Sequence, residues 1–181
     1  MKQFAGGVMK FKLLLIAILA WSFAHGEAAR AQERATIQAL ATVVSSLSLI
    51  GTNDLQFGTV TLGVSKAVEK IDVGFAGEWT ITGTPSAELT IDFTLPTVLR
   101  TLDTLSTMPI TFRATDASYG FALANQTTPL GVVNPNGPVV QRIGAGGQLF
   151  IWIGGVVWPR ISQTGGDYSA PILLTVAYTG N

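Results

Sequence analysis

The chain has 181 residues, of which 48% are hydrophobic and 12% are charged, with eleven basic residues against eleven acidic ones. This composition excludes a disordered polymer, because such chains are poor in apolar residues and rich in net charge. The basic residues are too few and too scattered for a nucleic-acid interface. Since there is no cysteine, the core must hold the fold without disulfides.

Residues 1–31 have the three parts of a secretory signal peptide. Three lysines precede an apolar run at residues 13–21, and Ala29 and Ala31 supply a small-x-small cleavage site. The apolar run is well short of the roughly 20 residues that a membrane-spanning helix needs. We therefore expect cleavage after Ala31 and export to the periplasm, the cell surface or the medium, with no integral membrane segment left. The signal has a bacterial appearance.

Cleavage would leave residues 32–181 as one domain, with seven basic and ten acidic side chains and a net charge of −3. About 150 residues can bury a sufficient core without disulfides. The single histidine, His25, lies within the signal, so the mature domain has neither imidazole nor thiol. Serine–histidine and cysteine catalysis and the usual zinc sites are thereby excluded. We expect no enzyme, no cofactor and no metal.

One pair of carboxylates needs separate comment, because glycoside hydrolysis requires only two such groups. Glu88 and Asp92 lie four residues apart in one predicted strand, which places them on one face roughly 13 Å apart. That separation exceeds the range of either hydrolytic mechanism. We interpret both as solvated positions.

Apolar residues of the mature chain recur with a period of two, the period of half-buried strands. Leu89, Ile91, Phe93 and Leu95 alternate with polar residues, and turn signals rich in Gly, Pro, Asn and Asp separate the runs. The pattern predicts an antiparallel β-sandwich or barrel. The predicted strands are 35–43, 47–50, 55–61, 66–73, 78–83, 88–95, 108–114, 119–124, 148–153 and 168–179.

Two predicted strands offer alternatives. The strand 148–153 is apolar on both faces, so either a loop covers it or Phe150 and Trp152 face outward as an association surface, to which Trp158 would add a third aromatic. In the first mature strand, 35–43, every second residue is small or apolar: Ile37, Ala39, Ala41 and Val43. That strand can pair with its own sheet or add to a neighbour's sheet, whether another copy or another surface subunit.

Three stretches resemble the DUF4402 family, exported bacterial domains of undefined function. Leu55-Gln56-Phe57-Gly58-Thr59-Val60 is similar to its early strand. Gly83-Thr84-Pro85-Ser86-Ala87-Glu88-Leu89-Thr90-Ile91 is similar to its Gly-rich strand pair, with Thr94-Leu95-Pro96 following. Gly165-Gly166-Asp167-Tyr168-Ser169, before Leu174-Thr175-Val176-Ala177-Tyr178, resembles its closing strand, although Ala170-Pro171 replace the usual Gly-Thr.

The resemblance covers about residues 36–181 and implies an immunoglobulin-like sandwich at the cell surface, similar in layout to fimbrial subunits and spore-coat-U-like proteins. It brings no catalytic residues. The expected function is a structural or adhesive, pilin-like subunit, with a secreted carbohydrate- or peptide-binding module as the alternative.

Tyr168 also has a physical interpretation of its own. It follows Gly165-Gly166-Asp167 at the start of a predicted strand, where its hydroxyl can turn back onto the backbone of the preceding loop, as in a tyrosine corner. The alternative is an ordinary strand aromatic that packs against Leu149 or Trp152.

Overall fold

The computed structural model describes residues 46–180, and within this range the chain forms twelve strands and one 3-10 helix but no α-helix. In chain order these are β1 (Ser48–Asn53), β2 (Lys66–Val68), β3 (Gly77–Thr82), β4 (Glu88–Thr94), β5 (Val98–Arg100), β6 (Thr107–Thr111), β7 (Ala117–Gly120), η1 (Leu123–Thr127), β8 (Gly131–Val133), β9 (Val139–Arg142), β10 (Gln148–Ile153), β11 (Gly155–Val157) and β12 (Leu173–Tyr178). The pairings of these strands are antiparallel, which confirms the predicted all-β class. The predicted signal peptide (1–31) and first mature strand (35–43) lie outside the described residues.

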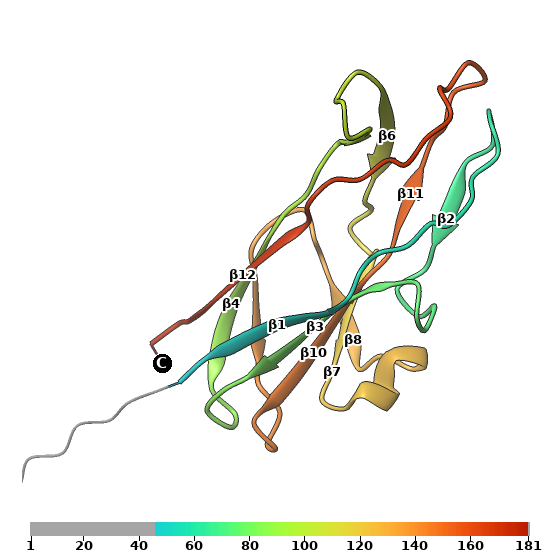
Figure 1. The fold of residues 1–181 in the computed structure, drawn as a ribbon. Coiled ribbons are helices and arrows are strands. Elements are labelled where there is room, and N and C mark those ends of the chain that lie inside the picture. The colour runs from blue at the N-terminus through green and yellow to red at the C-terminus, as the bar shows by residue number, and fades with distance from the viewer. Residues whose placement is uncertain (1–45, 181) are drawn as a thin grey trace, which may run out of the picture. The chain divides into compact units, whose positions relative to one another are not determined.

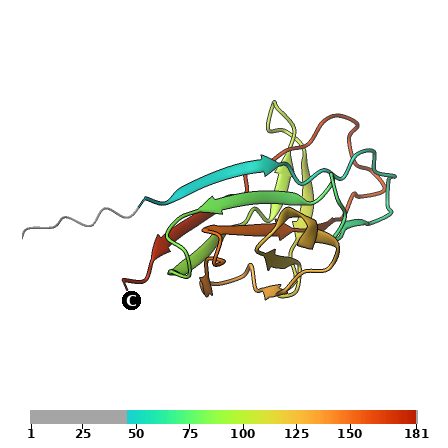
Figure 2. The same ribbon diagram turned by 90° about the horizontal axis from the view of Figure 1, so that it is seen from below.

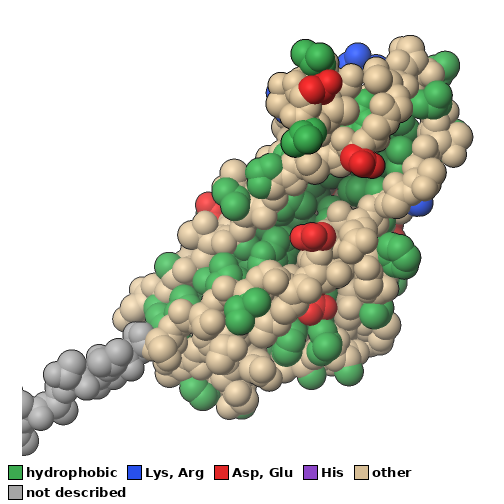
Figure 3. Space-filling view, in the orientation of Figure 1, with side chains coloured by type: hydrophobic (Ala, Val, Ile, Leu, Met, Phe, Trp, Pro, Cys, Tyr) green, Lys and Arg blue, Asp and Glu red, His purple; other side chains and the backbone are tan. Residues whose placement is uncertain are grey.

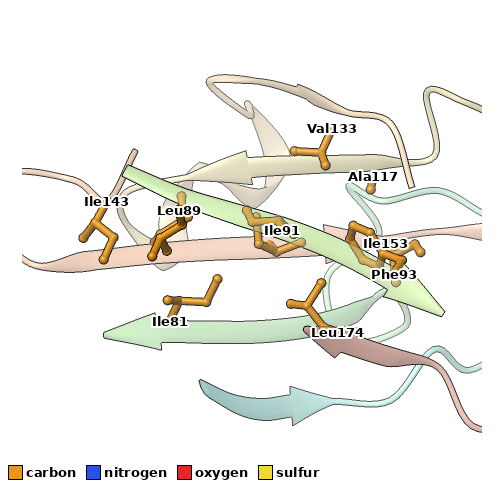
Figure 4. Close-up of a cluster of buried hydrophobic side chains, with 11 residues drawn as sticks. Ile81, Leu89, Ile91, Phe93, Ala117, Val133, Ile143, Ile153 and Leu174 are labelled. Atoms are coloured by element: carbon orange, nitrogen blue, oxygen red, sulfur yellow. The ribbon is translucent and has the colours of Figure 1, made fainter. Parts of the chain in front are cut away.

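Two of the sheets pack face to face. The larger has five strands in the order β1-β3-β10-β7-β8, and the smaller has three in the order β12-β4-β9 (Figures 1 and 2). Both contribute to one buried apolar cluster, in which Ile81 and Ile153 of the larger sheet meet Ile91 and Leu174 of the smaller (Figure 4). The layers and the shared core are those of a β-sandwich.

The smaller sheet follows the alternation predicted from the sequence. In β4, Leu89, Ile91 and Phe93 enter the core, whereas Asp92 between them is exposed. This is the pattern of an antiparallel strand with one covered face. The prediction of one apolar face for this strand is confirmed.

A third sheet has four strands in the order β2-β11-β6-β5 and lies at one end of the sandwich (Figure 1). The chain passes from β10 into β11 across the single residue Gly154, so one extended segment serves both sheets. Met108, Ile110 and Val157 form a small buried cluster in this sheet. Partly buried residues of the segment before β2, among them Leu55 and Phe57, pack against this cluster.

The predicted strand 55–61 is wrong. Its first residues do alternate, with Leu55 and Phe57 half-buried and Gln56 exposed between them, but no strand pairs with them. Gly58 has a φ of 58°, which ends the extended run. The alternation correctly indicated that one face of this segment is covered. It did not show whether another strand pairs with the segment.

The predicted last strand, 168–179, is too long, because β12 begins only at Leu173. Ser169 makes an isolated bridge with Arg100, after which pairing is interrupted. Pro171 explains this gap, since proline has no backbone N–H to donate to a ladder. Four short strands (β5, β8, β9 and β11) and η1 were not predicted, because three or four residues are too few to show a period.

No helix within residues 46–180 combines the length and the apolar character that crossing a membrane requires.

Candidate interaction site

Phe150 and Trp152 are buried, so the alternative in which they face outward as an association surface is wrong. Both lie on the face of β10 that points away from the main core, yet Trp152 is 0% exposed and Phe150 8% exposed. Their rings stack on each other, with centroids 6.1 Å apart and an interplanar angle of 9°. The alternative, a central strand covered on both faces, is the one that the structure contains.

The cover over Trp152 comes from the loop after β7. A Cβ atom added at Gly120 would lie 3.0 Å from the Trp152 ring and 2.5 Å from Cβ of Asn125, so η1 sits directly over the indole. Gln126 of η1 is buried too, and its amide donates to the carbonyl of Lys70 at 3.4 Å. A short helix and the loop after β2 together shield this face. Because η1 was not predicted, the sequence could not show the cover.

The indole of Trp152 is fully satisfied by the neighbouring strands. Its Nε1–H donates to Oε2 of Glu78 at 2.9 Å, and Oε1 of the same carboxylate accepts from the hydroxyl of Thr52 at 2.6 Å. These contacts connect β10, β3 and β1. Trp152 therefore stabilises the large sheet rather than offering a ligand platform.

Trp158 differs from the other two aromatics. It follows β11, is 49% exposed, and donates its indole N–H to Oγ1 of Thr111 at 2.9 Å. Of the three aromatics proposed as an interaction surface, it alone remains accessible.

Tyr168 makes the contact expected of a tyrosine corner. Its hydroxyl donates to the carbonyl oxygen of Thr164 at 2.7 Å, four residues upstream, and accepts from the side-chain amide of Gln163 at 2.6 Å. Gln163 in turn donates to the carbonyl of Thr107 at the start of β6. The ring packs against the second apolar cluster and not in the main core. Tyr168 thus fixes the loop 163–168 against the four-stranded sheet.

Replacing Tyr168 with Phe should therefore lower the free energy of unfolding by about 1 kcal/mol, the usual net value of a hydrogen bond. Urea denaturation of the purified protein measures this. Tyr119→Phe is the matched control, because the Tyr119 hydroxyl makes no hydrogen bond within residues 46–180. Equal stability of the two variants would mean that the corner contributes nothing.

A large groove lies between the chain that follows β1 and the chain that precedes β12. Its volume is about 1120 Å³. One lip is residues 53–60 and the other is residues 163–172, and neither lip belongs to a strand beyond Asn53. Figure 3 shows the hollow, with hydrophobic side chains in its floor.

The floor of the groove is apolar and comes from the sheets beneath it. Met108 and Ile110 of β6, Val157 of β11, Leu99 of β5 and Trp79 of β3 line it. The small cluster of Met108, Ile110 and Val157, unlike the main core, is thus covered on one side only by two lips that do not pair with each other. A hollow of this kind is the usual form of a binding site for an apolar or extended ligand.

The charged residues that line the groove are both acidic. Asp54 stands on one lip and Asp167 on the other, and the lining includes no Lys or Arg. Lys66 lies near the first lip, but its ammonium donates to the carbonyl of Thr59 at 3.0 Å. The groove therefore combines an apolar floor with a weakly negative rim.

The other ionisable groups serve local structure. Asp116 is buried and accepts from the backbone N–H of Arg113 at 2.8 Å and from its Nε at 2.9 Å, a pairing that raises the pKa of Arg113. The hydroxyl of Thr101 and then the backbone N–H of Leu105 lower the pKa of Asp103 in the β5–β6 loop. Within residues 46–180 no three His, Cys, Asp or Glu side chains gather as a metal site would require.

Glu88 and Asp92 do share a face of β4, as predicted, but their surroundings differ. Glu88 pairs with Arg142 at 3.5 Å and accepts from the hydroxyl of Thr179 at 3.1 Å. Asp92 is exposed. Asp92 is the solvated position that the sequence predicts, whereas Glu88 is only partly exposed.

The chain matches no protein-family model, and it matches no curated protein.

Sequence reasoning named parts of both lips but not the groove. The stretches Leu55–Val60 and Gly165–Ser169 were singled out separately, for their resemblance to one family, and the structure places them opposite each other. The alternation of Leu55 and Phe57 was visible in the sequence, but it predicted a paired strand. No strand pairs with Leu55 and Phe57, and their covered face therefore forms one wall of the groove.

Proposed function

We propose that this chain is an exported, non-catalytic surface subunit that works by contact with other proteins. The observation that carries the proposal is the groove, because its floor is an apolar cluster that lies between two lips that do not pair with each other. A gap between two extended segments that do not pair with each other is a place where a third extended segment can add. The absence of imidazole and thiol from residues 32–181 agrees with a role that is not catalytic.

Membership of the DUF4402-like, immunoglobulin-like sandwiches is part of the same proposal. Two of the three stretches that carry the resemblance line the groove, and the third spans the turn from β3 into β4. If these stretches define the family, the groove is its shared feature. The proposed location is the periplasm or the cell surface, after removal of residues 1–31.

The proposal is tested by expressing the full chain in a Gram-negative bacterium and measuring the intact mass and the location of the product. We expect a protein that begins at Gln32, lies outside the cytoplasm and elutes as more than one species in size-exclusion chromatography with light scattering. An uncleaved chain in the cytoplasm would contradict export. A clean monomer at every concentration would contradict the subunit role.

The alternative is a monomeric module that holds a carbohydrate or peptide on exposed aromatics. Fewer aromatics are available for this role than the sequence suggested. Phe150 and Trp152 are buried, which leaves Trp158 as the accessible member. A glycan array with Trp158→Ala as the control tests it. Binding that survives in this variant would remove the aromatic surface altogether.

A further inference from the structure

We propose that the groove between residues 53–60 and 163–172 accepts the segment Arg34–Val44 of a second copy of this chain, which adds there as an extended strand. The inference rests on the proposed subunit function and names its partner and the contact surface. It is argued from the groove, from the charge of its rim and from the sequence of the segment before β1.

The first step is the fit of the segment to the floor. Met108, Ile110 and Val157 lie beneath the opening, and Leu55 and Phe57 turn inward from one lip. An added strand must present an apolar residue at every second position to such a floor. In residues 37–43 every second residue is Ile, Ala, Ala and Val, mostly small, as a confined space demands. Eleven residues extend about 36 Å as a strand, which is more than the eight-residue lip requires.

The second step is charge. Arg34 is the only charged residue between Glu33 and Asp54, so the segment carries one positive charge followed by an uncharged run. The groove offers Asp54 and Asp167, one on each lip, with no basic residue in its lining. A cation entering between two carboxylates is favoured, and the uncharged remainder costs little to desolvate on an apolar floor.

The third step decides between the chain's own segment and that of a neighbour. The chain enters the domain at Ser46, whose carbonyl oxygen accepts from the hydroxyl of Tyr178 at 3.0 Å, at the end of β12. Leu47 then packs against the main core. The groove lip begins several residues further on, at the opposite end of β1. To fill the groove, its own segment would have to reverse direction immediately before this fixed point.

Residues 41–47 are poorly suited to such a reversal. They contain no Gly, Pro, Asn or Asp, the residues that tight hairpins require. Two consecutive valines within the stretch favour an extended backbone instead. A segment that does not reverse cannot fill its own groove, and the groove of a neighbour is then the one open to it. Each copy then donates at one end and accepts in its groove, a head-to-tail contact that builds a chain of subunits.

The test uses the absence of cysteine from the chain. One full-length variant carries Gln38→Cys, on the face of the segment expected to point outward, and a second carries Gln56→Cys, on the exposed face of the lip. The two purified proteins are mixed and treated with a short bis-maleimide. The matched control replaces Gln56→Cys by Val132→Cys, which is exposed on β8, an edge strand of the five-stranded sheet that does not line the groove.

Cross-linked dimers from the first mixture, at least tenfold more abundant than from the control mixture, are the expected result. Equal yields from both mixtures would overturn the proposal, because any sheet edge would then serve. A chain carrying both cysteines that cross-links only within itself would also overturn it, since the occupant would be the chain's own segment. If oligomers form in solution without any groove cross-link, this inference fails while the subunit function stands. If the protein is monomeric throughout, both fail.

A second measurement does not depend on cysteine chemistry. Arg34→Glu should raise the concentration at half-assembly by ~2- to 5-fold at low salt, the range of one exposed ion pair. Asp54→Lys together with Asp167→Lys should restore assembly of this variant. Failure of the double charge reversal to restore it would contradict the placing of Arg34 at the rim.

Discussion

Trp152→Ala should lower the free energy of unfolding by about 3–5 kcal/mol, the usual cost of removing a large buried aromatic. The side chain is 0% exposed, stacks on Phe150 and lies under η1, so truncation opens a cavity between a central strand and its cover. The loss has a second part. The carboxylate of Glu78 loses the indole N–H that its Oε2 accepts at 2.9 Å and stays half-buried, with Thr52 as its remaining donor.

The matched control is Trp158→Ala, which removes the same side chain from a position that is 49% exposed. We expect it to cost no more than about 1 kcal/mol. A third variant, Trp152→Phe, keeps most of the volume and removes the hydrogen bond, so it separates the two parts. Urea denaturation followed by circular dichroism measures all three. Similar losses for Trp152→Ala and Trp158→Ala would show that the cover over β10 does not form.

The expected result also governs any ligand-binding experiment. If Trp152→Ala abolishes binding of a glycan, the cause is loss of the large sheet, because the side chain never reaches the surface. Trp158→Ala changes an accessible aromatic and leaves the core intact. Only this second variant separates a ligand contact from a folding defect.

The amount of structure that the sequence predicted depends on the length of each element. β4, of seven residues, shows a full period of two, and β10, of six, is a continuous apolar run; the sequence located both to within a residue. Strands of three residues, such as β5 and β11, show no period. The sandwich class followed from the long strands alone.

The candidate site was less predictable for a different reason. A groove is a relation between segments that lie more than a hundred residues apart, here Leu55 and Tyr168. The sequence showed one covered face for Leu55 and Phe57, and it showed a turn before Tyr168. It could not show that these two segments face each other without pairing. The sequence left the burial of Trp152 open for the same reason, since its cover comes from η1 and not from its own strand.

Gly154 determines how the sandwich connects to the groove, and a single methyl group there should be costly. A Cβ atom at this position would collide with the carbonyl oxygen of Val68 and would lie 2.8 Å from N of Lys70 and 2.9 Å from C of Glu69. These are backbone atoms, which cannot rotate away as the end of a side chain can. We expect Gly154→Ala to destabilise the protein by about 2–3 kcal/mol, as overpacking in a filled interior does.

Gly146→Ala is the control, because a Cβ atom there meets nothing within 4 Å. It should change stability by no more than about 0.5 kcal/mol. Which strands are loosened is as informative as the total loss of stability. The pairing of Gly155 with Val68 joins β11 to β2, and Val157 of β11 is part of the groove floor, so amide hydrogen exchange should quicken in β2 and β11.

Exchange in β4 and β12 should stay close to that of the unchanged protein, since those strands pair with each other and with β9 away from this point. The same variant should also weaken assembly if the groove is the acceptor, because its floor would shift while the main core persists. Uniform acceleration across all strands would instead mean that the four-stranded sheet is not a separate unit of stability. Assembly that is unchanged despite local loosening of β11 would place the contact on another surface.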